Sequence, residues 1–598
     1  MVYDNKEYEI QLNFCTDPFC KWFGKPQEHF KGKLHRYRKS GSDTISIFCN
    51  ENPNKKTPGY ITSTSTTLLS NWSIAEEIDR LANNNKVINK DPVYEFHKAG
   101  CTNISATPFA SVELFHKRGK SSSNSQKWQC KECKKITNTL PSIRECFTYH
   151  QKRNDILPKF ADLLLNRVPV KRTCEILGIG NSTYYNKLEI LYQRCLEFLE
   201  KHEQEAFKKR DFDEMYLDTD YMMYYLNNVR RKGKGGERYD NLEDAKLETH
   251  IAATGDVFSR YILRADIAFD WNFSMETLWQ TTYALKEDHL PYYSRAADRY
   301  KFSVYPQPPT PLDKQTKKEV ENELMPIKRR EQYVGGLHIT STYTAIAHLW
   351  LIREMVKSKK WWLNTDDDNT IKTALLRVFA EEIALGNAHC FITSIEETKS
   401  KPEAYREWIK YTKELLNWGQ IYYGRKNVNL YTAARKFLEI KLKSHNFYEW
   451  SNVNGVIFKK KATTPINHPI PTIDEGIRSI HCFTDVSDLS NRDLATAMVN
   501  VNQQVLKSFF GQIHRRISIF ERPLLTARRD RKSYIYANFN PKYGQYALTI
   551  LRTYHNFCQP WSSSRNKGGS KEKAVLTPAQ RLGLTNKVFE MKDIIYLK

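Results

Sequence analysis

The stretch KKWWLNTDDDNTIKTALLRVF, residues 359 to 379, sets the expected fold of the chain. The segment KWWL is short and apolar enough for an interior strand, and three aspartates, Asp366 to Asp368, follow it directly. A helix is expected from about Asn369, and an aspartate at a helix N-terminus stabilises the helix by about 1 kcal/mol. Capping accounts for one of the three carboxylates, so metal binding is the alternative for the others.

A second acidic strand is expected at DEMYLDTDYMMYYL, residues 213 to 226. Because side chains alternate along a strand, Tyr216, Asp218 and Asp220 share one face. Two carboxylates in mid-strand are costly to bury without a partner, which here means arginines or a divalent cation. Enzymes that act on nucleic acids use two such cations, and Mg²⁺ prefers carboxylate oxygens. From these residues alone, a catalytic cation site and a structural salt-bridge cluster are both open.

The charge balance of the 598-residue chain points to a polyanionic partner. Lysine and arginine outnumber aspartate and glutamate 92 to 68, a net charge of +24 with a pI near 9.3. Nucleic acid is the first candidate partner and an anionic membrane surface the second. The length predicts roughly three to five domains. We find no apolar run near the roughly 18 residues of a membrane span, and no export signal, so a soluble cytoplasmic protein is expected.

Three further elements follow from the local pattern. Residues 68 to 85 have apolar positions at helical spacing after an Asn cap, so a short helix is expected there. Residues 248 to 269 contain two strand-like runs around a Gly-Asp turn, which predicts a hairpin. A long helix is expected at 493 to 520.

The twelve cysteines indicate metal binding rather than disulfides in a reducing cytosol. The only CxxC pair, CKEC, supplies two of the four ligands of a tetrahedral zinc site, and FHKAGC upstream supplies candidates for the other two. The expected ligands are His97, Cys101, Cys130 and Cys133, and the alternative is a degenerate ribbon that holds no metal. An earlier group, Cys15, Cys20 and Cys49, either binds zinc with His35 or has lost its metal.

A third acid is harder to choose. In FFGQIHRRISIFERPLLTARR, residues 509 to 529, Glu521 lies beside Arg515, Arg516 and Arg522, and the residues alone favour an ion pair with those arginines. As a catalytic acid, Glu521 would follow the long helix that returns the chain to the sheet. The alternatives are Glu381, Glu382, Glu396, Glu397 and Glu475.

Several strings together resemble the DDE transposases of bacterial insertion sequences. They are KRGKSSSNSQKWQCKECKKIT, CEILGIGNSTYYNKLEIL, YLDTD, WLNTDDDNTIKTA, HRRISIFERP and RTYHNFCQPW with TPAQRLGL, and they span most of the chain. The resemblance implies a multidomain α/β protein with an RNase H-like mixed sheet flanked by helices, preceded by zinc-ribbon and helix-turn-helix modules. It places the family acids on Asp220, Asp366 and Glu521, with Asp368 competing for the second role.

The resemblance also implies the chemistry. Two Mg²⁺ (or Mn²⁺) ions per active site bridge the three acids and the scissile phosphate, while zinc is structural. Water frees a 3′-hydroxyl at the element end, and that hydroxyl attacks target DNA. The alternatives are a catalytically silent DNA-binding regulator, and a nuclease of the same fold that cuts without strand transfer.

The helix-turn-helix is expected where VKRTCEILGIG ends at a glycine-marked turn and NSTYYNKLEIL begins. The alternative is an ordinary αα-hairpin. The expected DNA contacts are Lys171, Arg172, Asn181, Ser182, Thr183, Tyr184 and Lys187, with Arg515 and Arg516 near the third acid.

The expected partners are double-stranded DNA, both terminal repeats and target, and further copies of the chain, at least a dimer on DNA. No membrane is expected, and the protein would associate with the nucleoid of a bacterium. The expected domains are 1–66 (first ribbon, possibly degenerate), 67–88 (helical connector), 89–140 (second ribbon), 150–205 (helix-turn-helix), 210–400 (catalytic core), 401–492 (inserted subdomain), 493–560 (core with Glu521) and 561–598 (basic tail).

Overall fold

The structure is a computed structural model of the chain. It describes residues 2–3, 6–7, 9–20, 23–25, 35–40, 44–50, 63–88, 94–121, 125–140, 153–225, 248–274, 299, 316–319, 321, 335–395, 399–445, 448–453, 456–462, 465–520, 524–525, 532–533, 540–562 and 575–597. Among these residues, no helix is both long and apolar enough to cross a membrane.

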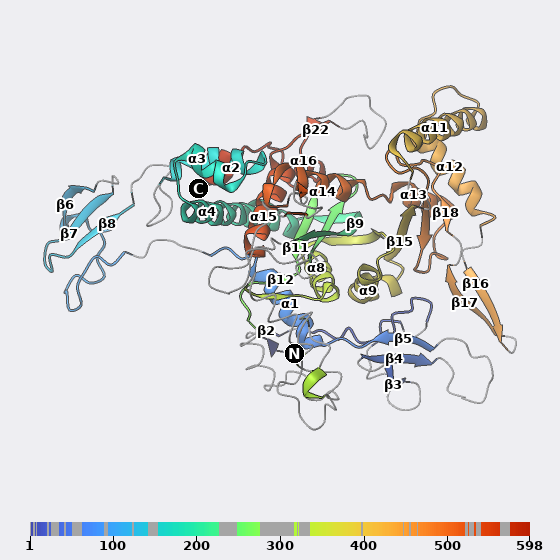
Figure 1. The fold of residues 1–598 in the computed structure, drawn as a ribbon, viewed down its shortest axis with the longest axis horizontal. Helices are drawn as coiled ribbons and strands as arrows, with labels where there is room; N and C mark the ends of the chain where they lie inside the picture. Colours follow the sequence, from blue (N-terminus) through green and yellow to red (C-terminus); the bar gives the residue numbers. More distant parts are fainter. Residues whose placement is uncertain are drawn as a thin grey trace.

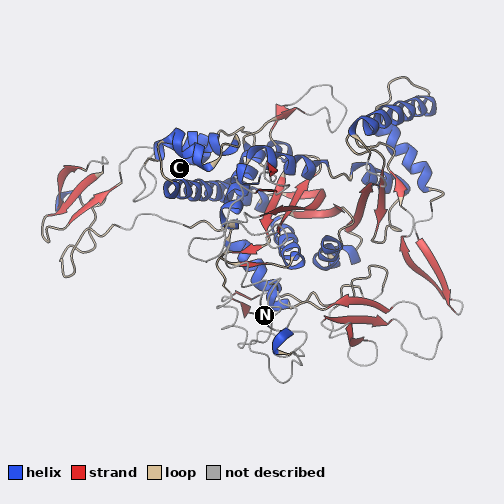
Figure 2. Ribbon diagram, in the orientation of Figure 1, coloured by secondary structure: helices blue, strands red, loops and turns tan. Residues whose placement is uncertain are grey.

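A mixed sheet of seven strands forms the centre of the protein (Figures 1 and 2). In spatial order the strands are β11 (Ile262–Ile267), β10 (Glu248–Asp256), β9 (Asp211–Tyr225), β14 (Lys357–Thr365), β15 (Ala388–Ile395), β19 (Arg478–Cys482) and β18 (Ile466–Asn467). The first three are antiparallel neighbours, β14 and β15 run parallel to β9, and β19 and β18 are again antiparallel. The predicted strand at 213 to 226, the strand containing KWWL and the hairpin at 248 to 269 are all confirmed.

Helices cover both faces of this sheet (Figure 1). On one face lies α8 (Ser341–Met355), whose His348 is hydrogen-bonded to Thr254 of β10. Thr254 is the cross-strand partner of Thr219. On the other face lies α14 (Gln504–Arg516), since a Cβ added at Gly255 would lie 2.7 Å from Val505. Further helices near the sheet are α9 (Asn369–Val378), α10 (Ala380–Ala384) and α15 (Pro541–Phe557).

The helix predicted at 68 to 85 is present as α1 (Asn71–Asn83), but it is part of the core and not a free connector. It packs on α8, and its acids are buried among arginines. Arg299 contacts Glu77 at 3.0 Å and Asp270 at 3.2 Å, while Arg80 pairs with Glu77 at 2.6 Å. Because removing one partner of a buried ion pair strands the other charge, this network ties α1 firmly to the sheet.

The region after β15 differs from the expected insertion at 401–492. It begins with α11 (Lys401–Tyr423) and α12 (Leu430–Leu442), followed by the hairpin β16 (Tyr448–Val453) and β17 (Val456–Ala462). Its last part, however, supplies β18 and β19 of the central sheet. The single helix expected at 493 to 520 is also wrong, since α13 (Asn491–Asn500) ends before α14 begins and the side chain of Asn502 caps the second helix.

Two small sheets lie outside the centre. The strands β3 (His35–Ser40), β4 (Thr44–Asn50) and β5 (Ser63–Thr67) form one of them. The second contains β6 (Phe115–Lys120), β7 (Gln126–Cys130) and β8 (Ile136–Thr139), at the far left of Figure 1. Short ladders pair β1 (Val2–Tyr3) with β2 (Lys6–Glu7), β12 (Phe269–Asp270) with β13 (Leu337–His338), β20 (Leu524–Leu525) with β21 (Lys532–Ser533), and β22 (Trp561–Ser562) with β23 (Val575–Leu576).

A helical layer joins residues from both ends of the chain. It contains α2 (Leu157–Leu165), α3 (Val170–Leu177) and α4 (Asn181–Leu199), which continues through a π-helical turn into α5 (Glu205–Lys208). On α4, Tyr192 stacks on Tyr546 of α15 with ring centroids 4.0 Å apart. The tail expected at 561–598 is wrong for the described residues 575–597, because α16 (Pro578–Leu582) and α17 (Met591–Ile595) bury Ile594 and Ile595 against the core.

Candidate functional site

Two carboxylates meet where neighbouring parallel strands pass each other. Asp218 and Asp220 lie on β9, and the register pairs Asp218 with Asn364 on β14. The Asn364 amide donates to Asp218 Oδ1 at 2.9 Å. Asp220 lies two residues further along β9, and Asp366 follows directly after the end of β14, close enough for its charge to raise the pKa of Asp220. The structure brings these two predicted residues together.

The cluster carries more negative charge than its surroundings neutralise. Burial, and then the charge of Asp366, raise the pKa of Asp220 to about 7. Burial and the neighbouring Asp220 also raise the pKa of Asp218 well above its usual range. The second oxygen of Asp218, Oδ2, is buried with no hydrogen-bond partner among the described residues. A buried, unpartnered carboxylate oxygen is costly unless a cation or a proton satisfies it.

Asp366, Asp367 and Asp368 have different surroundings. Asp368 is the N-cap of α9, where its Oδ1 accepts from the backbone N–H groups of Thr370 at 2.7 Å and Ile371 at 3.0 Å. Asp367 forms an ion pair with Lys372 at 2.6 Å. Burial and the neighbouring Asp368 raise the pKa of Asp366 above its ordinary value. Of these three aspartates, Asp366 has the largest effect on the pKa of Asp220, and Asp368 has a smaller one.

The third predicted acid, Glu521, lies outside the described residues, as do Glu396 and Glu397. The helix that returns to the sheet, α14, carries no acid. Instead its Lys507 forms an ion pair with Glu475, and the charge of Lys507 lowers the pKa of both Asp218 and Asp220 against the effect of burial. Of the alternative acids, Glu381 and Glu382 pair with Arg353, and Glu475 is linked to the cluster through Lys507.

A buried polar chain that the sequence did not reveal supports β9 from the opposite face. Thr219 and Thr254 share a hydrogen bond of 2.9 Å, and Thr254 contacts His348 Nε2 at 2.8 Å. His348 Nδ1 in turn contacts Asp266 at 2.7 Å, and Arg264 neutralises Asp266. Burial lowers the pKa of His348. Because Thr219 lies between Asp218 and Asp220, the chain fixes the strand segment that carries both carboxylates.

A second cluster lies in the sheet of β6, β7 and β8. The ligand atoms of its four members, one imidazole and three thiols, all lie within 4.8 Å of one another, and three of the residues are buried. Cys130 ends β7, and Cys133 follows in a turn in which Lys134 has a positive φ of 59°. The four residues are those expected for the tetrahedral site: His97, Cys101, Cys130 and Cys133. This buried group could hold a metal ion of the zinc type.

Hydrogen bonds around the cluster orient its donor atoms. His97 Nε2 lies 2.7 Å from the Ala106 carbonyl, so it carries the proton and leaves Nδ1, 3.4 Å from Cys101 Sγ, as a ligand atom. Burial raises the pKa of the Cys133 thiol, but the N–H groups of Lys98 and Lys135 outweigh it and lower that pKa. A thiol that ionises readily is what a metal ligand requires. In the first cysteine group, the side chains of Cys49 and His35 lie outside the described residues.

The predicted DNA contacts divide into exposed and buried residues. Lys171, Arg172, Asn181 and Ser182 are exposed, and Thr183 is half-buried. Tyr184 and Lys187 are 1% exposed each, so their predicted place in a DNA groove is wrong. Tyr184 packs edge-on against Phe160 at 5.0 Å, and Lys187 Nζ donates to Asn154 at 2.8 Å.

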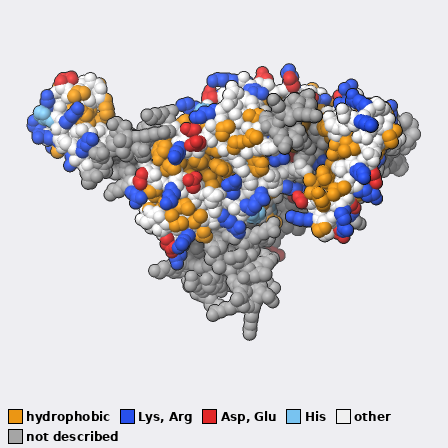
Figure 3. Space-filling view, turned by 90° about the horizontal axis from the view of Figure 1, so that it is seen from above, with side chains coloured by type: hydrophobic (Ala, Val, Ile, Leu, Met, Phe, Trp, Pro, Cys, Tyr) orange, Lys and Arg blue, Asp and Glu red, His pale blue; other side chains and the backbone are white. Residues whose placement is uncertain are grey.

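The remaining predicted contacts, Arg515 and Arg516, end α14. Arg515 is exposed, whereas Arg516 lies over the Tyr554 ring at 5.3 Å. Figure 3 shows lysine and arginine side chains spread over the upper face, interspersed with apolar and some acidic ones. The positive charge on this face is therefore distributed and does not form one patch.

Comparison with known proteins adds little. No protein-family model matches the chain, and no curated protein matches it closely. A crystal structure of a pre-cleavage Mos1 transpososome matches at 11% sequence identity, over 40% of this chain and 81% of that chain, with a TM-score of 0.07. A TM-score this low carries no argument about the fold or the function of this chain.

Proposed function

We propose that the chain is a DNA transposase of the DDE type, which cleaves the ends of a mobile element and joins them to target DNA. The observation that carries the proposal is Asp220 on β9 with Asp366 directly after the adjacent parallel strand β14, beside the Asp218 oxygen that has no partner among the described residues. In chain order, β9, β10 and β11 form an antiparallel set, and β14 and β15 then run parallel to β9. This strand order supports an RNase H-like core.

Carboxylate oxygens are the ligands that hard divalent cations prefer. Asp220 and Asp366 would hold Mg²⁺ or Mn²⁺, two ions per site with a third acid, and Asp218 has a free buried oxygen behind them. When bound, these ions polarise the scissile phosphate and lower the pKa of the attacking water. Asn364 holds Asp218 in place, and the buried chain through Thr219 keeps β9 from shifting. Asp368 remains the cap of α9 and positions the strand end.

The other parts fit DNA binding. We assign structural Zn²⁺ to the His97 cluster, where the metal would stabilise a small sheet with few core residues of its own. Gly178, with φ 62°, ends α3 three residues before Asn181 begins α4, a spacing found in helix-turn-helix modules. Lys171 and Arg172 would contact phosphates, and Asn181, Ser182 and Thr183 would approach base edges. Two DNA ends imply at least a dimer on DNA.

A second candidate is a silent DNA-binding regulator with the same architecture. The observation that favours it is Lys507, which brings a positive charge toward Asp218 and Asp220 from the helix that packs on their face of the sheet. A lysine in that position takes over part of the neutralisation that a cation would otherwise supply.

Cleavage of end-labelled DNA decides between these functions. The substrate is the DNA that flanks the coding region, with Mg²⁺ present or chelated. We expect Mg²⁺-dependent cleavage that disappears in Asp220→Asn and Asp366→Asn, with DNA binding retained. Asp367→Asn is the matched control, because its carboxylate is paired with Lys372. Binding without cleavage would favour the regulator, and cleavage without joining to a second DNA would leave a nuclease.

A further inference from the structure

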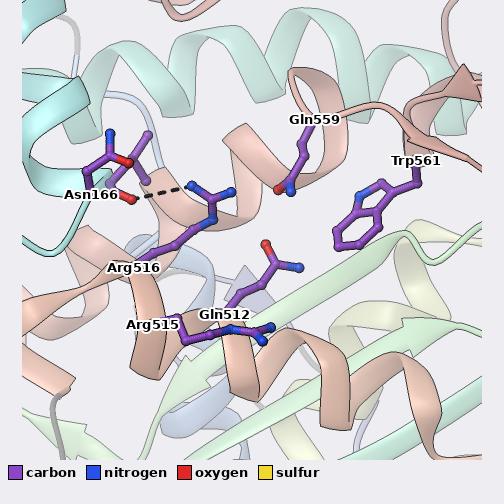
Figure 4. Close-up of a pocket in the computed structure, with 7 residues that line it drawn as sticks. Asn166, Gln512, Arg515, Arg516, Gln559 and Trp561 are labelled. Atoms are coloured by element: carbon purple, nitrogen blue, oxygen red, sulfur yellow. Dashed lines mark hydrogen bonds between the residues drawn. The ribbon is translucent and has the colours of Figure 1, made fainter.

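A polar pocket of about 300 Å³ lies where the helical layer meets α14 (Figure 4). Its walls come from the end of α2, the last turn of α14 and the segment after α15. Figure 4 shows the side chains of Gln512, Gln559 and Trp561 converging on this space. The volume is at the small end of ligand pockets and matches one planar heterocycle better than a larger ligand.

The orientation of Gln512 is fixed from behind. Burial lowers the pKa of His555 to about 4, so the imidazole is neutral, and its Nε2–H donates to the Arg260 carbonyl at 3.0 Å. His555 Nδ1 is then an acceptor, and it takes a hydrogen bond from the Gln512 amide nitrogen at 3.1 Å. Gln512 is 3% exposed, and its amide oxygen has no hydrogen-bond partner in the described part of the chain.

Two more buried polar atoms at the pocket have no hydrogen-bond partner among the described residues. They are Gln559 Oε1 and the indole Nε1 of Trp561. The Trp561 ring is held by Arg260, whose guanidinium lies over it at 5.6 Å. One donor and two acceptors around one pocket are an arrangement that a base edge can satisfy. Unsatisfied buried groups otherwise cost about 1–3 kcal/mol each.

The rim carries positive charge. Arg515 is exposed at the pocket mouth, while Arg516 contacts the Leu165 carbonyl at 3.5 Å and forms part of the wall. A guanidinium beside a pocket that binds a base is suited to the phosphate of the same nucleotide.

We propose that this pocket binds one nucleotide, with its base against Gln512, Gln559 and Trp561 and its phosphate on Arg515. The identification of the nucleotide as part of a DNA strand rests on the proposed function. Lys507, which lies close enough to Asp218 and Asp220 to affect them, precedes Gln512 by five residues on α14, or about 8 Å along the helix axis. An unpaired nucleotide in the pocket would hold the strand within a few nucleotides of the carboxylates.

The test uses the full chain with zinc retained and divalent cations other than zinc omitted, so that binding is measured without cleavage. The probes are a DNA duplex carrying one unpaired 2-aminopurine, the same duplex with an abasic analogue there, and free dAMP. The pocket variants are Gln559→Leu and Trp561→Phe, the second of which keeps one aromatic ring and removes the indole N–H donor together with the five-membered ring. Arg492→Gln, an exposed charge change on α13, is the matched control.

We expect the native chain to bind the unpaired base about tenfold more tightly than the abasic duplex, with a change in 2-aminopurine fluorescence. Both pocket variants should lose this preference, and Arg492→Gln should keep it. Saturable binding of free dAMP that Trp561→Phe abolishes would support the pocket and identify a free nucleotide as its ligand. Equal affinity for both duplexes, with no dAMP binding, would overturn the proposal. Asp220→Asn separates the two proposals, because it should abolish cleavage and leave the base preference intact.

Discussion

The carboxylate cluster should lower the stability of the protein when no cation is bound, and replacing Asp220 with asparagine should recover part of that stability. In the folded chain the pKa of Asp220 is about 7, against 3.8 for an unperturbed aspartate. The folded state therefore binds the proton more tightly than the unfolded state. Stability falls as pH rises from about 4 to about 7, and the loss is complete above that range. The asparagine variant has no such loss, and its amide oxygen can still accept from the Tyr221 N–H.

The magnitude follows from the same values. At 1.36 kcal/mol per pH unit, the difference between about 7 and 3.8 corresponds to about 4 kcal/mol for an isolated group. Asp218 and Asp366 interact with Asp220, so the group does not titrate alone and one substitution recovers only part of this sum. We expect Asp220→Asn to stabilise the Mg²⁺-free protein by about 2 kcal/mol at pH 8, and by little at pH 4.

Thermal unfolding with zinc retained and no other divalent cation added, followed by tryptophan fluorescence at both pH values, measures this effect. Asp162→Asn is the control, because Asp162 is an exposed acid on α2 whose removal should change the midpoint little at either pH. Adding Mg²⁺ should raise the midpoint of the native chain and not that of Asp220→Asn, since a ligand that binds the folded state stabilises it. A variant that is less stable than the native chain at pH 8, or equally stabilised at both pH values, would refute the reasoning.

Three further predictions concern other parts of the chain. Cys130→Ser should lower the zinc content, measured by mass spectrometry, from one ion per chain towards zero, and should make the β6–β8 sheet sensitive to protease; full zinc content would contradict the assignment. Gly255→Ala should lower the unfolding midpoint by overpacking against Val505, costing about 1–3 kcal/mol, and Val505→Ala in the same chain should restore part of the loss. Changing Lys171 and Arg172 to glutamine should weaken DNA binding and reduce the slope of affinity against salt by about two, and an unchanged slope would leave α3 and α4 as a structural hairpin.

The local sequence was sufficient to predict the strands that carry the acids. Alternation in β9 placed Asp218 and Asp220 on one face, and the break after the apolar run of β14 placed Asp366 at the strand end. These inferences need only strand periodicity and the cost of burying charge. The helix expected at 493 to 520 failed because apolar spacing continues across Asn500 and Asn502, two residues whose side chains favour caps over helix interiors.

Contacts between distant segments could not be inferred. Lys187 looks like a phosphate contact on a recognition helix, but Asn154, 33 residues earlier, accepts from it in the interior. The orientation of the Gln512 amide likewise depends on His555 and, through it, on Arg260, which no local pattern connects to α14. Periodicity therefore identifies which face a side chain occupies and leaves its partner unknown.

The burial of α1 limits how this chain can be divided or recombined. The helix α1 precedes the sheet of β6, β7 and β8, here called the Cys/His sheet, in the sequence. It nevertheless provides the counter-ions of Arg299 and packs on α8. The guanidinium of Arg377 on α9 donates a hydrogen bond to the backbone carbonyl of Thr67, shortly before α1. A truncation that begins after the Cys/His sheet would leave cationic side chains without neutralising acids inside the core. The Cys/His sheet has a small core of its own and can be exchanged as a unit, whereas α1, which precedes it in the chain, shares a core with β9 and β14.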